Sequence, residues 1–209
     1  MDKRVALFAS VIVVAFLGGM AGLLLFGGGD RDDDQYAACR GSAIAGGAGS
    51  IGGPFELLNH EGATVTDADV ITKPSLLYFG FTFCPDVCPL DVSRNSDALV
   101  ALQEQGRDVQ GVFISIDPER DTPEVVGEYA DLFYHTVGLT GSPEQVKAAS
   151  RAYKTYYQKE DTDDEEFYLI AHSTQTYLVL PDEGFVDFFR RTDSPEAIAE
   201  TVSCYMDAA

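Results

Sequence analysis

The sequence predicts an α/β fold in which a mixed β-sheet is flanked by helices. An aromatic-rich run at 76–81 suits a strand covered on both faces. Two later apolar runs around a turn at 181–184 suit an antiparallel hairpin. The strands alternate with helix starts in which Pro follows a hydroxyl residue, at Thr122-Pro123, Ser142-Pro143 and Ser194-Pro195. Alternation of strands and helices favours parallel pairing, so the closing hairpin makes the sheet mixed.

The expected elements follow one another in a simple order. Residues 55–65 predict a short hairpin whose turn lies at 59–62, where Asn and Gly favour chain reversal. Apolar runs place the other strands at 76–81, 109–116, 137–139, 167–171, 176–180 and 185–190. Helices are expected from Pro89 onward and at 122–134, 142–153 and 194–206.

Cys84 and Cys88 occupy the turn between the strand at 76–81 and the next helix, and each is followed by a proline. A helix N-terminus carries partial positive charge, so we expect it to favour a thiolate at Cys88. The pair can oxidise to a disulfide or hold a soft metal such as Cu(I). The alternative is a purely structural disulfide, although a bridge over so short a loop removes little chain entropy.

A cysteine pair between a strand and its helix is typical of thioredoxin-like folds. Here three residues separate the cysteines instead of two, which leaves room for a metal. Copper held by two thiolates usually takes a third ligand, and imidazole is a suitable donor. His172 is the best candidate, because it lies just before the strand at 176–180. His60 falls in a turn, and His135 ends a helix where a cation is favoured.

The N-terminus predicts a membrane anchor. Residues 5–26 carry no charge, and about 20 such residues span a bilayer as a helix. Lys3 and Arg4 precede the run, so this end should stay in the cytoplasm and the rest of the chain should lie outside. A cleaved signal peptide is the alternative, but the apolar core is longer than a typical one. Residues 36–39 weakly resemble a lipoprotein cleavage site, but an acidic segment separates them from the apolar run.

We therefore expect three parts: a membrane anchor at 1–29, a flexible acidic and Gly/Ala-rich linker at 30–53, and one folded domain at 54–209. Cys39 in the linker and Cys204 in the last helix are the remaining cysteines. An even number of cysteines in an exported chain suits two pairs, so we hypothesise a Cys39–Cys204 disulfide. Free thiols at both positions are the alternative.

The net charge of −20 at pH 7 argues against nucleic acid as a partner and against tight binding of the domain to anionic lipid. The acidic run at 161–166 is either a solvated loop or a device that steers a basic partner. The sequence contains no Gly-rich phosphate loop and no zinc-type set of paired CxxC motifs.

The stretch at 78–89, YFGFTFCPDVCP, closely resembles the signature of the Sco/SenC family of copper proteins. Three further matches follow in the same order, at 115–123, at 138–141, and at His172-Ser173 together with the turn at 180–185. One departure is Ala171, which stands where the family commonly has Asp before the ligand His.

The resemblance implies a thioredoxin-like domain that faces the periplasm or the intermembrane space. Cys84, Cys88 and His172 would bind Cu(I) or Cu(II) and help to build the binuclear copper site of cytochrome c oxidase subunit II. The protein would be a single-pass protein of the inner membrane with its soluble domain in the periplasm. Other periplasmic copper or thiol–disulfide proteins are further possible partners.

Two functions compete at this point. One is a copper metallochaperone that passes its metal to the cysteines of a target by ligand exchange. The other is a periplasmic thiol–disulfide oxidoreductase, in which Cys84 attacks a target disulfide and Cys88 resolves the mixed disulfide. Any enzymatic activity would be of this reductase kind. A peroxide-reducing relative of thioredoxin is a third, remote alternative.

Overall fold

A computed structural model describes residues 16, 35–40, 48–162 and 167–209. The chain divides into two units, Met1–Ala38 and Cys39–Ala209, and the second contains the folded domain. Its central sheet has five strands in the order β5-β4-β3-β8-β9. These are β3 (Ser75–Gly80), β4 (Gln110–Ser115), β5 (Thr136–Leu139), β8 (Thr176–Leu180) and β9 (Gly184–Phe189).

The pairing makes the sheet mixed, as predicted. Strands β3, β4 and β5 are parallel, whereas β8 is antiparallel to β3 and β9 is antiparallel to β8. Every residue of β3 is buried, which suits a central strand with both faces covered. The hairpin predicted at 55–65 is also present, as β1 (Glu56–Leu58) paired with β2 (Thr64–Thr66).

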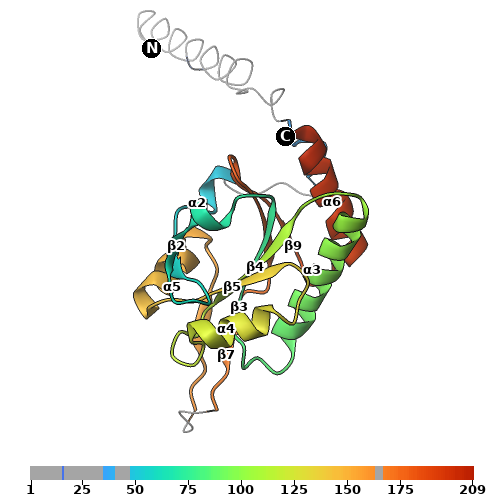
Figure 1. The fold of residues 1–209 in the computed structure, drawn as a ribbon. Helices are drawn as coiled ribbons and strands as arrows, with labels where there is room; N and C mark the ends of the chain where they lie inside the picture. Colours follow the sequence, from blue (N-terminus) through green and yellow to red (C-terminus); the bar gives the residue numbers. More distant parts are fainter. Residues whose placement is uncertain (1–15, 17–34, 41–47, 163–166) are drawn as a thin grey trace, which may run out of the picture. The chain divides into compact units, whose positions relative to one another are not determined.

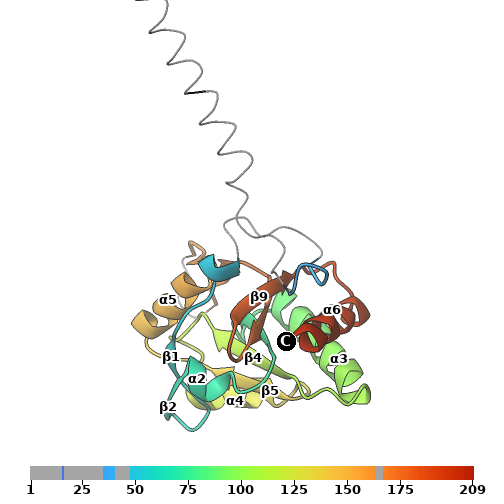
Figure 2. The same ribbon diagram turned by 90° about the horizontal axis from the view of Figure 1, so that it is seen from above.

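Helices cover both sides of the sheet. Figures 1 and 2 show α3 (Val87–Glu104) and α6 (Pro195–Ala208) together on one side and α5 (Pro143–Ala152) on the other. Helix α4 (Pro123–Ala130) packs along β5. The three predicted helix starts are confirmed, because each N-cap hydroxyl accepts a hydrogen bond from an amide of the first turn, at Thr122, Ser142 and Ser194.

Several boundaries differ from the prediction. Helix α3 begins at Val87, two residues before Pro89, so Cys88 lies inside the first helical turn. Helix α4 ends at Ala130, because residues 131–134 form turns instead of a last helical turn. The strand expected at 167–171 is shorter and shifted, as β7 (Ile170–His172).

Two short helices and one strand were not predicted at all. Strand β6 (Tyr157–Lys159) pairs antiparallel with β7. Its residues are partly or fully exposed and do not form an apolar run. Helix α2 (Asp67–Val70) begins with a capping box at Thr66, and η1 (Ala48–Ser50) is a short 3-10 turn. Elements of three or four residues are too short to show a hydrophobic period.

The predicted membrane anchor at 5–26 lies outside the described residues except for Phe16. No helix within the described ranges combines the length and the apolar character that crossing a membrane requires. Half of the linker predicted at 30–53 also lies outside the described residues, which include only 35–40 and 48–53 of it.

The hypothesised disulfide between Cys39 and Cys204 is confirmed, with Cα atoms 5.6 Å apart and 165 positions between the two residues. The bond fastens the chain ahead of η1 to the last helix, α6. It therefore closes a loop that contains almost the whole domain, and such loops restrict the unfolded chain most strongly.

We expect Cys204→Ser to lower the free energy of unfolding by about 2–4 kcal/mol, because the unfolded chain regains the freedom of the open loop. Urea unfolding of the detergent-solubilised chain measures it. Cys39→Ser should give the same loss, and the double variant should add nothing. Additive losses in the double variant would contradict this account.

Candidate metal centre

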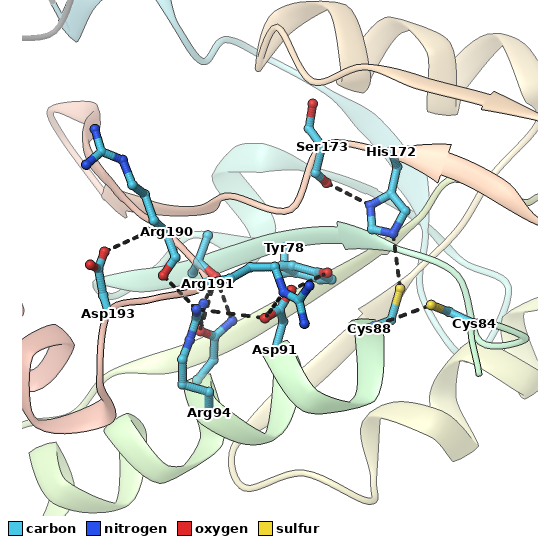
Figure 3. A network of polar contacts seen from close by, with 12 residues as sticks. Tyr78, Cys84, Cys88, Asp91, Arg94, His172, Ser173, Arg190, Arg191 and Asp193 are labelled. Carbon is cyan, nitrogen blue, oxygen red and sulfur yellow. Dashed lines mark hydrogen bonds and ion pairs between the residues drawn. The ribbon is translucent and has the colours of Figure 1, made fainter. Parts of the chain in front are cut away.

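Three predicted site residues come together at one edge of the central sheet. Cys84 lies in the turn after β3, Cys88 in the first turn of α3, and His172 at the end of β7. Their sulfur and imidazole nitrogen atoms all lie within 4.8 Å of one another. The Sγ of Cys88 is 3.4 Å from Nε2 of His172, and the amide of Cys88 donates to Sγ of Cys84 at 3.4 Å (Figure 3). In the described part of the chain, no other His, Cys, Asp and Glu side chains form such a group.

His172, expected between the strands at 167–171 and 176–180, is the last residue of β7 and pairs with Tyr157 of β6. Its Nδ1 lies 2.7 Å from the carbonyl oxygen of Ser173. A carbonyl oxygen only accepts, so Nδ1 carries the proton and Nε2 presents a lone pair toward Cys88. The ring also meets Tyr78 and Phe81 edge-on, at centroid distances of 6.2 and 5.9 Å.

Burial governs the protonation of two of the three candidate ligands. It lowers the pKa of His172 below the ordinary value, which keeps the imidazole neutral and able to bind a metal. Burial also raises the pKa of the Cys88 thiol, with Cys84 nearby adding to the effect. The expectation that the helix N-terminus favours a thiolate at Cys88 was therefore wrong. The side chain is 0% exposed, and burial favours the neutral thiol over the thiolate.

A polar network centred on the buried Asp91 lies behind the site. The hydroxyl of Tyr78 donates to Asp91 at 3.0 Å, and Nε of Arg191 donates to the other oxygen of Asp91 at 3.2 Å. Arg94 lies 3.8 Å from the same carboxylate and donates to Thr176 at 3.0 Å (Figure 3). The network thus connects helix α3, which carries Cys88, to the start of β8, which follows His172 closely in the chain.

Sequence reasoning missed this network. One signal was available: Asp91 lies one turn after Cys88 and next to Val92, which belongs to the apolar stripe of the helix. A carboxylate beside a buried stripe needs partners, because an unpaired buried charge is costly. The partner Arg191 follows β9, about a hundred residues later, and nothing local in the sequence points to it.

The other two histidines stay away from the site. His60 is exposed in the turn between β1 and β2. His135 precedes β5, has a positive φ of 46°, and stacks on Tyr134 at 4.2 Å. Neither belongs to the group around Cys84.

Gly80, the last residue of β3, allows Cys88 to approach the sheet. A Cβ at this position would lie 3.0 Å from Sγ of Cys88 and 2.9 Å from the ring of Tyr78. These neighbours are held in the core, so Gly80→Ala must push the sulfur away. We expect it to lower the free energy of unfolding by about 1–3 kcal/mol, and to weaken Cu(I) binding.

Chemical denaturation and competitive Cu(I) titration measure the two effects of Gly80→Ala. The control is Gly49→Ala in η1, where an added Cβ meets nothing within 4 Å. If Gly80→Ala binds Cu(I) as tightly as the control variant, the close approach of Cys88 to β3 does not matter for copper binding.

Comparisons with known proteins agree with this geometry. A model of the SCO1/SenC family matches residues 45–207. Protein SenC of Rhodobacter capsulatus is 49% identical over 211 residues, which cover 99% of this chain and 92% of SenC. The mitochondrial SCO1 homolog 1 of Arabidopsis thaliana is 42% identical over 158 residues. That match covers 75% of this chain and 47% of the plant protein, so the chain accounts for about half of that relative's length.

A solved structure shares the fold. The crystal structure of Arabidopsis thaliana ScoI with copper bound has a TM-score of 0.71 and 41% sequence identity, and the match covers 75% of this chain and 99% of that one. The family model extends over most of the present chain, and the identity to SenC extends along nearly all of it. This protein therefore belongs to the SCO1/SenC family.

Proposed function

We propose that this protein is a copper metallochaperone. It binds Cu(I) or Cu(II) through Cys84, Cys88 and His172 and delivers the ion to the binuclear copper site of cytochrome c oxidase subunit II. The observation that carries the proposal is the convergence of two sulfurs and one imidazole nitrogen within 4.8 Å. A relative of 41% identity was crystallised with copper bound, which supports the choice of metal.

The donor set fits copper in both oxidation states. Thiolates are soft donors that suit Cu(I), whereas imidazole also suits Cu(II). A structural zinc site is usually closed by four protein ligands. Three donors leave a position open, and an incoming thiolate of a recipient protein can take that position during transfer.

The two cysteines differ in access. Cys84 is 8% exposed and Cys88 is 0% exposed, so a recipient approaches from the side of Cys84. Cys88 keeps its proton in the metal-free chain, because burial raises its pKa. Copper binding therefore releases this proton, and the neutral His172 supplies its Nε2 lone pair without losing one.

The location follows from the N-terminal part. We propose that residues 5–26 anchor the chain in the inner membrane and that the domain at 54–209 faces the periplasm. The charge pattern around the apolar run supports this orientation. The Cys39–Cys204 disulfide supports an oxidising compartment, because such bonds are rare in the cytosol.

A second function remains for the same residues. Cys84 and Cys88 are both free thiols, and their sulfurs lie within 4.8 Å of each other. Such a pair can reduce a disulfide: Cys84 attacks, Cys88 resolves the mixed disulfide, and the pair ends oxidised. Because a recipient must have reduced cysteines before it accepts copper, this reaction can precede delivery at the same target.

Removing the imidazole separates the two functions. We expect His172→Ala to lose one nitrogen ligand and to bind copper at least about tenfold more weakly, while dithiol exchange with a model disulfide is largely unchanged. X-ray absorption of the copper-loaded chain and competition titration measure the copper effects. His60→Ala, at an exposed turn, is the control. An unchanged nitrogen signal in His172→Ala would remove this residue from the ligand set.

Delivery itself is tested with the recipient. We expect the copper-loaded chain to transfer its ion to the isolated copper domain of subunit II when the recipient cysteines are reduced, and not when they form a disulfide. Chromatographic separation and metal analysis measure where the copper resides. If copper stays on the donor although the reduced recipient accepts free Cu(I), delivery to subunit II is wrong.

A further inference from the structure

We propose that Arg120 is a positioning residue for the metal centre. It holds the hairpin of β6 and β7, which carries His172, against the turn that carries Cys84. Arg120 lies in the loop at 116–122, between β4 and α4. From this loop it contacts both the turn that carries Cys84 and the segment that leads into β7. The inference rests on the proposed copper site, because it concerns the placement of one of its ligands.

The hairpin has little other support from backbone pairing. In the described part of the chain, β6 and β7 form a separate two-stranded sheet and do not join the central one. Each strand has only three residues. An isolated two-stranded hairpin is marginal in water, so side-chain contacts must fix its position.

Arg120 supplies such a contact through Tyr168, two residues before β7. The guanidinium carbon of Arg120 lies 3.5 Å from the centroid of the Tyr168 ring, which is 4% exposed. The hydroxyl of Tyr168 donates to Asp117, and Nε of Arg120 forms an ion pair with the same carboxylate. Arg120, Asp117 and Tyr168 therefore form a closed set of contacts between the loop and the hairpin.

The same guanidinium reaches the cysteine turn. Its carbon lies 4.8 Å from the centroid of Phe83, the residue before Cys84, and 5.8 Å from that of Phe81. The next residue, Asp121, accepts hydrogen bonds from the amide and hydroxyl of Thr82 at 3.0 and 2.6 Å. The loop at 116–122 thus contacts both the turn that carries Cys84 and the hairpin that carries His172.

The chemistry of arginine explains the choice of residue. Its planar, delocalised cation stacks on aromatic rings while its edge pairs with a carboxylate. A lysine carries the charge but cannot make both contacts with one flat group. A neutral side chain of similar length fills the same space but makes neither the stacking contact nor the ion pair.

Hydrogen exchange of the metal-free full chain in detergent tests the contact without copper. We expect Arg120→Met to speed exchange of the β6 and β7 amides about tenfold, the scale of one lost buried cation–π contact. Arg120→Lys should restore part of the protection. Amides of β3 and α3 should keep theirs. The control is Arg107→Met, which breaks an ion pair with Asp207 on α6.

Two results of the exchange experiment overturn the proposal. One is hairpin exchange in Arg120→Met no faster than in Arg107→Met, and the other is equal loss of protection throughout β3 and α3, which indicates a merely structural role. Tyr168→Leu removes the ring that both Arg120 and Lys159 contact, but leaves the ion pair of Arg120 with Asp117. If Arg120→Met does not fold, Tyr168→Leu is compared with Lys159→Met, which keeps the contact of Arg120 with the ring: faster hairpin exchange in Tyr168→Leu supports the proposal, and equal exchange overturns it.

Copper binding then tests the action through His172. We expect Arg120→Met to reduce the nitrogen hyperfine coupling in the Cu(II) electron paramagnetic resonance spectrum, and to weaken copper binding about tenfold. In a His172→Ala background, Arg120→Met should weaken binding no further, because the residue on which it acts is gone. An equal loss in both backgrounds contradicts positioning. If the unaltered chain takes up no copper, the proposed function fails. The hydrogen-exchange experiment still tests whether Arg120 holds the β6–β7 hairpin in place.

Discussion

The site depends on the way in which β3 pairs with its two neighbours. Because β3 and β4 are parallel, the cysteine turn after β3 and the loop after β4 leave the sheet at the same edge. Because β8 is antiparallel to β3, the chain that contains His172 enters the sheet at that edge too. The register places Gly80 opposite Ser115 and Tyr78 opposite Thr176, so the three segments meet over a few residues. Parallel strands commonly gather their functional loops at their carboxyl ends.

The same packing gives the two cysteines different chemical properties. Gly80 leaves room for the sulfur of Cys88 against the sheet, and burial there raises its thiol pKa. Cys84 is also buried but keeps 8% of its surface exposed. Asp91 forms ion pairs with both Arg191 and Arg94 beside the site, so the network holds two cations for one carboxylate. In the proposed copper site, the ion would reach the sulfur of Cys84 before that of Cys88, whose proton it must displace.

The sequence predicted the parts that depend on local chemistry. Apolar runs located the strands of the central sheet, and hydroxyl caps followed by Pro located the starts of α4, α5 and α6, because both signals act over a few residues. The pairing of Cys39 with Cys204 followed from the even number of cysteines. Prediction failed for properties that depend on tertiary packing. Burial reversed the expected effect of the helix terminus on Cys88, and the partners of Asp91 come from distant segments.

Of the three candidate ligands, His172 lies on strands that do not join the central sheet. The cysteines lie on the turn and helix that follow β3, at the centre of the molecule, and moving them disrupts buried contacts with the sheet. His172 belongs to a two-stranded hairpin outside the central ladder, and regions with few backbone bonds to the core open at low free energy. The proposed copper carrier needs firm capture and ready release. Under that proposal, the two sulfurs fixed against the central sheet would supply the first, and the nitrogen of His172, on a hairpin held by a contact at Tyr168, would supply the second.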